Sequence, residues 1–303
     1  MFRSLLLFAA VIVVFATRAD AAPTPTELNE RLIVLVEQLG DAEFHVREEA
    51  ERELRKVGIP ALDALLTASE KDLDFEVRRR AERLVPEIEA AAHAERLRMF
   101  LADPRSQEAQ TVPGWKRFQT LVGDSLDSRR WFVSMHQAEP LVMLRADQRA
   151  ERTSAAIGER LADLLRPALR GRTAAMYQLS APSITALLFI GSRDDVTIHE
   201  QVATQVAQVA QGPALSNLLL NSTGDEAQRA IATKVLSQWI KARSQGWTAI
   251  TNLHLAQRFQ LAEAGRSVSR ELLGRAGLQS SIRGQALLAL ERFGNKEDVA
   301  IAE

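Results

Sequence analysis

The chain contains no cysteine among its 303 residues. This absence excludes disulfide bonds, thiolate metal sites, a catalytic thiol and the lipidated cysteine of a bacterial lipoprotein. Residues that break helices or favour strands are also sparse, with 15 glycines, 10 prolines and 5% aromatic residues. Because helix-forming residues such as Ala, Leu, Arg, Glu and Gln abound instead, propensity favours helix nearly throughout. We expect an all-α protein.

An excess of charge of either sign is absent too. The chain has 38 basic and 39 acidic residues, a formal net charge of −1. Such a balance gives no strong electrostatic attraction to nucleic acid or to an anionic membrane. We therefore expect no nucleic-acid partner.

The first residues form a pattern typical of a secretory signal peptide. Arg3 supplies the positive charge, Leu5 to Ala16 form an apolar run, and Ala19-Asp20-Ala21 matches the small-x-small cleavage pattern. The run is shorter than the roughly 20 residues of a membrane span. We predict cleavage between Ala21 and Ala22, removal of residues 1–21, a secreted or periplasmic location and no stable membrane insertion. The alternative is an uncleaved signal that anchors the protein, and a mature amino terminus far from Ala22 would contradict cleavage.

Two similar segments follow, displaced by 31 residues. DAEFHVREEAER runs from Asp41 to Arg52, and DLDFEVRRRAER runs from Asp72 to Arg83. Apolar and polar positions match together, which indicates an internal repeat. The matching pairs are Asp41/Asp72, Phe44/Phe75, Val46/Val77, Arg47/Arg78, Ala50/Ala81, Glu51/Glu82 and Arg52/Arg83.

Between these copies a helix is predicted to begin at Ile59-Pro60-Ala61-Leu62. The repeating unit is then a Pro-x-Leu helix, a turn that starts with aspartate, and a Val-Arg-x-x-Ala helix. This unit resembles a HEAT repeat of the short-period kind related to bilin-lyase-type repeats. The resemblance implies a solenoid of antiparallel helix pairs.

Each motif residue has an expected structural role in such a unit. Asp41 is expected to cap the following helix, and Arg47 to bond to acidic or carbonyl groups of the adjacent unit. The residues expected to face the partner helix are Phe44, Val46, Ala50 and Leu54. The second copy is expected to behave in the same way.

The rest of the chain divides into a linker and a less regular region. We predict HEAT-like repeats over 22–101, a linker or irregular loop over 102–114, and degraded repeats over 115–303. In the last region Pro213 starts a predicted helix, and Asp225 starts the next one. IGSRDDV, Ile190 to Val196, and FGNKEDV, Phe293 to Val299, are predicted turns between repeats.

A wider resemblance is carried by four features spread along the chain. The signal sequence, the Val-Arg-x-x-Ala pair, Gly114 to Phe118 and Arg283 to Leu290 look like a group of secreted bacterial HEAT-repeat proteins of unassigned function. The resemblance implies an α-solenoid that binds another macromolecule, and it carries no catalytic residue. The chain stops at Glu303, where the scheme would open another helix, so we expect a C-terminal capping repeat to be lacking. Either the chain is a truncated member of the group or its last apolar face meets a partner.

The letters GDSL, Gly123 to Leu126, raise an alternative. Resemblance to the GDSL esterases and lipases would make Ser125 a nucleophile. That chemistry needs a Gly-x-Asn-Asp block and an Asp-x-x-His pair, and the chain has neither. We predict instead that Gly123 ends a helix and Asp124 caps the next one. No catalytic, cofactor-binding or metal-binding residue is expected.

A surface rich in arginine is the candidate interaction site. Arg145, Arg149 and Arg152 are predicted to share a helix face, suited to an acidic peptide, a glycan acid or a phosphate. The arginines that follow are Arg160, Arg166, Arg170 and Arg172. The alternative is a solvated helix surface laced with salt bridges.

These patterns together predict an exported helical-repeat scaffold that mediates protein–protein interaction, without catalytic activity or a cofactor. The partner is expected to be another protein. The alternatives are a HEAT-like lyase, a non-catalytic subunit of an envelope enzyme, or the membrane-anchored scaffold.

Overall fold

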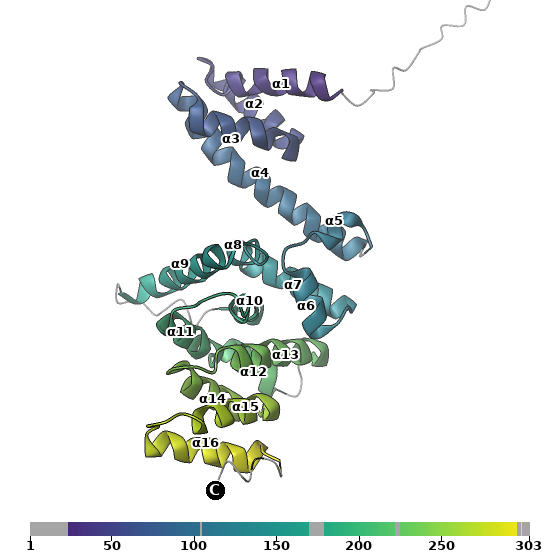
Figure 1. The fold of residues 1–303 in the computed structure, drawn as a ribbon. Coiled ribbons are helices and arrows are strands. Elements are labelled where there is room, and N and C mark those ends of the chain that lie inside the picture. The colour runs from purple at the N-terminus through teal and green to yellow at the C-terminus, as the bar shows by residue number, and fades with distance from the viewer. Residues whose placement is uncertain (1–23, 104, 170–178, 222–224, 296–297, 299–303) are drawn as a thin grey trace, which may run out of the picture. The chain divides into compact units, whose positions relative to one another are not determined.

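The structure, a computed structural model, describes residues 24–103, 105–169, 179–221, 225–295 and 298. The predicted signal sequence, with Ala21 and Ala22, lies outside this range. Every regular element in the described range is helical, so the predicted all-α class is confirmed (Figure 1). The chain forms two compact units, Met1–Glu95 and Arg96–Glu303, which we call the amino-terminal and carboxyl-terminal units. Each is described by itself below.

The amino-terminal unit contains two helix pairs. Its elements are α1 (Pro25–Gln38), α2 (Phe44–Val57), a 3₁₀ turn η1 (Ile59–Ala61), α3 (Leu62–Lys71) and the first part of α4 (Phe75–Ala102). Local sequence explains the start of α1, where a capping box forms: Glu27 N donates to Thr24 Oγ1 at 3.3 Å, and Thr24 N donates to Glu27 Oε2 at 2.8 Å. Proline occupies the first turn both in α1 and in η1.

Gly40 allows the two helix pairs to approach closely. A Cβ atom there would lie 2.8 Å from Val77 Cγ2 and 3.0 Å from Asp74 Oδ2. The turn after α1 therefore packs directly on the start of α4, which requires the smallest residue. Leucine and alanine side chains fill the space between the helices, and the buried ones include Leu32, Leu39, Ala50, Leu54, Leu65, Ala81 and Leu84.

The carboxyl-terminal unit contains the remaining helices, stacked in successive layers (Figure 1). They are α5 (Gln107–Gln110), α6 (Trp115–Val122), α7 (Leu126–Ala138), α8 (Pro140–Met143), α9 (Ala150–Leu169), α10 (Ala181–Gly191), α11 (Glu200–Ala210), α12 (Pro213–Leu220), α13 (Glu226–Ala242), α14 (Thr248–Arg258), α15 (Ala262–Leu273) and α16 (Ser280–Phe293). The segment 102–114 holds α5 and the buried side chain of Val112. The boundary between the compact units falls earlier, inside α4.

An aromatic cluster forms the centre of this unit's core. Phe132 of α7 lies with its ring centroid 5.3 Å from Trp115, 5.0 Å from Phe118 and 5.9 Å from Phe100. Phe189 of α10 closes the cluster, edge-on to Phe118 at 5.3 Å. These rings come from α4, α6, α7 and α10, so burial of large apolar surface fastens segments far apart in the sequence.

Turn chemistry predicted in the last third of the chain is also observed. Pro213 is the first residue of α12. Asp225 Oδ1 accepts hydrogen bonds from Ala227 N at 2.9 Å and Gln228 N at 3.3 Å, which caps α13. The helix that follows buries Ile231, Val235 and Trp239, whose spacing places them on one helix face.

Within the described part of the chain, no helix combines the length and the apolar character needed to span a membrane.

Candidate functional site

The two copies of the repeat motif have matching local structures, but their phenylalanines are not buried. Phe44 and Phe75 are the first residues of α2 and α4, and they are 63% and 66% exposed. The prediction that Phe44 faces the partner helix was therefore wrong. At the first position of a helix the side chain lies beyond the region that the partner helix covers. Ala50 and Ala81, six residues further along their helices, are fully buried.

The arginines of the motif hold their own turns. Arg47 Nη1 donates to the carbonyl oxygen of Asp41 at 2.5 Å, and Arg78 Nη1 donates to that of Asp72 at 2.6 Å. Each guanidinium also lies above the phenylalanine that precedes it by three residues, at 5.7 and 5.8 Å from the ring centroid. Arg47 thus bonds mainly within its own unit, with Glu76 of the next copy 3.9 Å from its Nε.

The motif aspartates act in the turn and do not cap the helix. Asp41 Oδ1 accepts from Glu43 N at 2.8 Å, and Asp72 Oδ1 accepts from Asp74 N at 2.9 Å. The capping role in α4 belongs to Asp74, whose Oδ1 accepts from Glu76 N at 2.7 Å. The expected cap was displaced because the helices begin two residues later than the pattern suggested.

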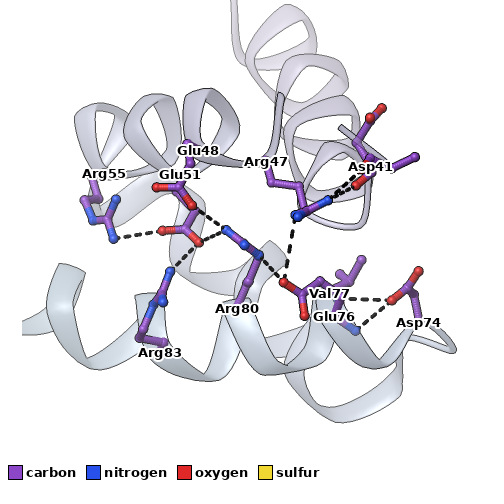
Figure 2. Close-up of polar contacts among 11 residues, drawn as sticks. Asp41, Arg47, Glu48, Glu51, Arg55, Asp74, Glu76, Val77, Arg80 and Arg83 are labelled. Carbon is purple, nitrogen blue, oxygen red and sulfur yellow. Dashed lines mark hydrogen bonds and ion pairs between the residues drawn. The ribbon is translucent and has the colours of Figure 1, made fainter. Parts of the chain in front are cut away.

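A buried ion-pair network joins α2 to α4, as Figure 2 shows. Glu51 is only 1% exposed and accepts hydrogen bonds from Arg55, Arg80 and Arg83. Arg80 also donates to Glu48 at 3.0 Å and to Glu76 at 2.6 Å. Because each carboxylate meets a guanidinium, the charges buried between the helices are compensated.

The network makes stability sensitive to acid. Burial by itself would raise the pKa of Glu51, but hydrogen bonds from Arg83, Arg80 and Arg55 outweigh it, so the pKa lies below its usual value. The pKa of Glu76 is lowered chiefly by its hydrogen bond with Arg80. A depressed carboxyl pKa stabilises the folded state above the unfolded value, about 4.3, and this stabilisation is lost as pH falls through the folded pKa.

We therefore expect the urea concentration at the unfolding midpoint of the amino-terminal unit to decrease as the pH is lowered from 5 to 2, roughly the carboxyl titration range. The Glu51→Gln variant should show a smaller fall, because one of the titrating groups is gone. Unfolding followed by far-UV circular dichroism at several pH values measures both. An equal acid response in the variant would contradict the contribution assigned to Glu51.

The GDSL segment is a helix junction. Gly123 ends α6 with a φ of 95°, which favours glycine, as predicted. The cap of α7 is Ser125, whose Oγ accepts from Ser128 N at 3.0 Å. Asp124, predicted to be the cap, instead forms a two-fold hydrogen bond with Arg129, at 2.7 Å for each pair of atoms.

The arginine surface predicted as an interaction site is not a helix face. Arg145 and Arg149 lie in the turn between α8 and α9, and only Arg152 lies in a helix. All three side chains are exposed, and Arg145 Nη1 donates to Gln148 Oε1 at 3.1 Å. Arg160 is held by Glu139 at 2.6 and 2.9 Å. The side chain of Arg166 and residues 170 and 172 lie outside the described part.

Three other arginines shape a different surface by fixing the turns of successive layers. Arg193 Nη1 donates to the carbonyls of Ala146 at 2.7 Å and Gln148 at 3.0 Å. In the next layer, the guanidinium of Arg243 bonds the carbonyls of Gly191, Arg193 and Val196, at 2.6 to 2.8 Å. In the layer after that, the guanidinium of Arg275 bonds those of Ser244 at 2.7 Å and Gly246 at 3.1 Å. Each arginine follows a helix and bonds to an earlier turn.

Two adjoining pockets open at the turns that precede α11, α14 and α16. The first, of about 520 Å³, which we call the polar pocket, is lined by Asp194, Thr197, Glu200, Arg243, Gln245 and Thr248 among others. The second, of about 350 Å³, which we call the apolar pocket, is lined chiefly by Trp247, Ile250, Leu272, Leu278 and Ile282. Glu200 and Gly246 line both pockets. The two cavities therefore form one continuous surface.

Trp247 is the prominent side chain of this surface. It is 65% exposed, whereas the other tryptophans of the chain are buried. Its backbone N–H donates to the Glu200 carboxylate, which ties the turn before α14 to the start of α11. Gly246 has a φ of 57°, and a Cβ atom there would collide with the same carboxylate. This hydrogen bond thus fixes the backbone from which the exposed indole projects.

Comparisons of the chain with protein families, with curated proteins and with solved structures found no match. In the described residues, no group of three or more His, Asp or Glu side chains is arranged to hold a metal ion.

Sequence reasoning did not identify the two pockets. Most of their residues come from the turn IGSRDDV and its continuation to Glu200, from Gln245-Gly246-Trp247-Thr248, and from the turn before α16 with the start of that helix. The available signal was a tryptophan placed directly after glycine in a short polar stretch. Such a tryptophan does not belong to the apolar face of a helix, so the sequence alone could have indicated that its side chain is exposed.

Proposed function

We propose that this chain is a helical-repeat scaffold that binds a segment of another protein at the polar and apolar pockets. The observation that carries the proposal is the exposed indole of Trp247, which lines the apolar pocket beside the polar pocket. Tryptophan is among the residues that most often dominate protein-binding energies, because it buries a large area in a stiff side chain. Exposing such a ring to water has a cost that a bound partner would remove.

The layered helices support this kind of function. Helix α11 packs against α14, and α14 against α16, so that their preceding turns present side chains on one continuous surface. Helix-pair repeats characteristically build extended binding surfaces in this way. The matching turns around Arg47 and Arg78 support a repeat of the HEAT-like kind, and we include a HEAT-like solenoid in the proposal.

We also propose that the protein is exported, since the amino-terminal sequence pattern is typical of a secreted or periplasmic protein. Nucleic acid is a poor match for the two pockets. The guanidinium groups at their walls already donate to backbone carbonyls, which leaves few free cations for phosphate.

Peptide selection tests the site. A random dodecapeptide library displayed on phage is selected on the full chain, and the enriched peptides are then tested for binding to the Trp247→Ala variant. We expect enriched peptides to bind the wild-type chain at least about tenfold more tightly than the variant, because loss of a tryptophan anchor typically costs about 2 kcal/mol or more. Fluorescence anisotropy with a labelled peptide measures the ratio.

Leu141→Ala is the matched control, because Leu141 is 75% exposed but lies in α8, away from the pockets. It should leave peptide binding unchanged. A second comparison reverses the charges of Arg145, Arg149 and Arg152 together. If that variant loses binding and Trp247→Ala retains it, the arginine surface is the binding site and the proposal made here is wrong.

A further inference from the structure

The polar pocket presents hydrogen-bond acceptors, because its cationic groups already have partners. Arg243 donates to three backbone carbonyls, and Arg275, at the edge of the apolar pocket, donates to two. These bonds hold the guanidinium groups against the turns. Because these arginine N–H groups already donate to backbone carbonyls, they are poor donors for a ligand that enters the pockets.

Two carboxylates at the same place keep free oxygens. Asp194 is exposed, and its side chain makes no hydrogen bond or ion pair with any other residue that the structure describes. Glu200 uses Oε1 to accept from Trp247 N, and its Oε2 has no partner in the described part of the chain. Asp195 differs, since Arg193 holds it at 2.6 Å. The groups of the polar pocket that remain free to bind a ligand are therefore carboxylate oxygens, which carry negative charge.

The apolar pocket has the opposite character. Trp247, Ile250, Leu278 and Ile282 present exposed or half-buried apolar surface there, and buried Leu272 forms part of the lining. A volume of about 350 Å³ holds one large side chain, such as leucine or phenylalanine. Because Glu200 and Gly246 belong to both pockets, a group in one pocket lies beside a group in the other.

From this pairing we infer that the occupant is an extended peptide segment with a lysine or arginine close to a large apolar residue. The basic side chain binds Asp194 and Glu200, and the apolar side chain packs against Trp247 and Ile282. Charge-assisted hydrogen bonds to the free carboxylate oxygens give the selectivity for a cation. The inference rests on the proposed function, because it names the partner chemistry of the same two pockets.

The peptide selection also tests whether the bound segment combines a basic and a large apolar residue. Enriched sequences that depend on Trp247 are expected to share a basic residue within three positions of a large apolar one. Trp247-dependent sequences without a basic residue, or with an acidic one, would overturn the inference and leave the proposed function standing. If no enriched sequence depends on Trp247, both fail.

Charge-neutral variants then test the two carboxylates directly. Replacing the basic residue of a selected peptide by glutamine should weaken its binding to the wild-type chain about tenfold, the usual effect of one charge-assisted hydrogen bond. On the Asp194→Asn/Glu200→Gln variant, the two peptides should bind within about twofold of one another. A retained tenfold preference on that variant would overturn the assignment.

Matched controls separate this effect from damage to the fold. Asp127→Asn removes an exposed carboxylate of α7 and should leave the peptide preference unchanged. Glutamine at position 200 keeps an oxygen that accepts from Trp247 N, so the turn before α14 is preserved. Thermal melting of each variant confirms folding before binding is measured, and the single variants are tested as well.

Discussion

Replacing Glu51 with alanine is expected to lower the free energy of unfolding of the amino-terminal unit by about 3–5 kcal/mol. Glu51 is almost completely buried between α2 and α4, and it accepts hydrogen bonds from three arginines. Removing the carboxylate leaves the guanidinium of Arg80, itself largely buried, without its closest partner (Figure 2). Arg80 keeps Glu48 and Glu76, so its charge is then only partly compensated, and breaking a buried ion pair costs several kcal/mol, far more than the pair contributes over a neutral equivalent.

Urea unfolding with two probes measures this change. The four tryptophans all lie in the carboxyl-terminal unit, so tryptophan fluorescence reports that unit, while far-UV circular dichroism reports both. The Glu51→Ala variant should shift the circular-dichroism transition to lower urea. Hydrogen exchange in α2 and α4, followed by mass spectrometry, locates the loss.

Glu49→Ala is the matched control in the same helix. Glu49 pairs with Arg52 at 2.8 Å, but both side chains are exposed to water. Exposed pairs typically contribute only about 0–1 kcal/mol, since water screens them. If the two variants lose the same stability, the network around Glu51 does not stabilise the contact between α2 and α4 as described.

Local sequence patterns predicted most of the helices. Proline and a capping residue marked the starts of α12 and α13 correctly, because such signals depend on residues only a few positions apart. The internal repeat likewise predicted matching turns at Asp41 and Asp72. The repeat did not predict that Phe44 and Phe75 are exposed, because periodicity does not show where a partner helix ends.

The arginine surface shows the other limit. Spacings of four and three between Arg145, Arg149 and Arg152 match a helix, yet the chain turns there. Long-range bonds hold that turn: Gly114 N donates to Asp147 Oδ2 at 2.6 Å, and Arg193 donates to the carbonyls of Ala146 and Gln148. Partners so distant in sequence are invisible to a local pattern. The same reason explains why the pockets around Trp247, assembled from three turns, were not predicted.

The second large effect is expected in the carboxyl-terminal unit, where Phe132→Ala should lower the free energy of unfolding by about 3–5 kcal/mol. Phe132 is fully buried and contacts rings from three other helices, at α4, α6 and α10. Truncation removes apolar burial and leaves a cavity that the neighbouring rings cannot close without losing their own contacts.

Tryptophan fluorescence during urea unfolding measures this effect, since Trp115 lies beside Phe132 in the cluster. Leu141→Ala serves as the control, because an exposed side chain on α8 should change stability by less than about 0.5 kcal/mol. Phe132→Leu should lose less than Phe132→Ala, since leucine fills part of the space. If both Phe132 variants unfold like Leu141→Ala, the aromatic cluster does not fasten these helices together.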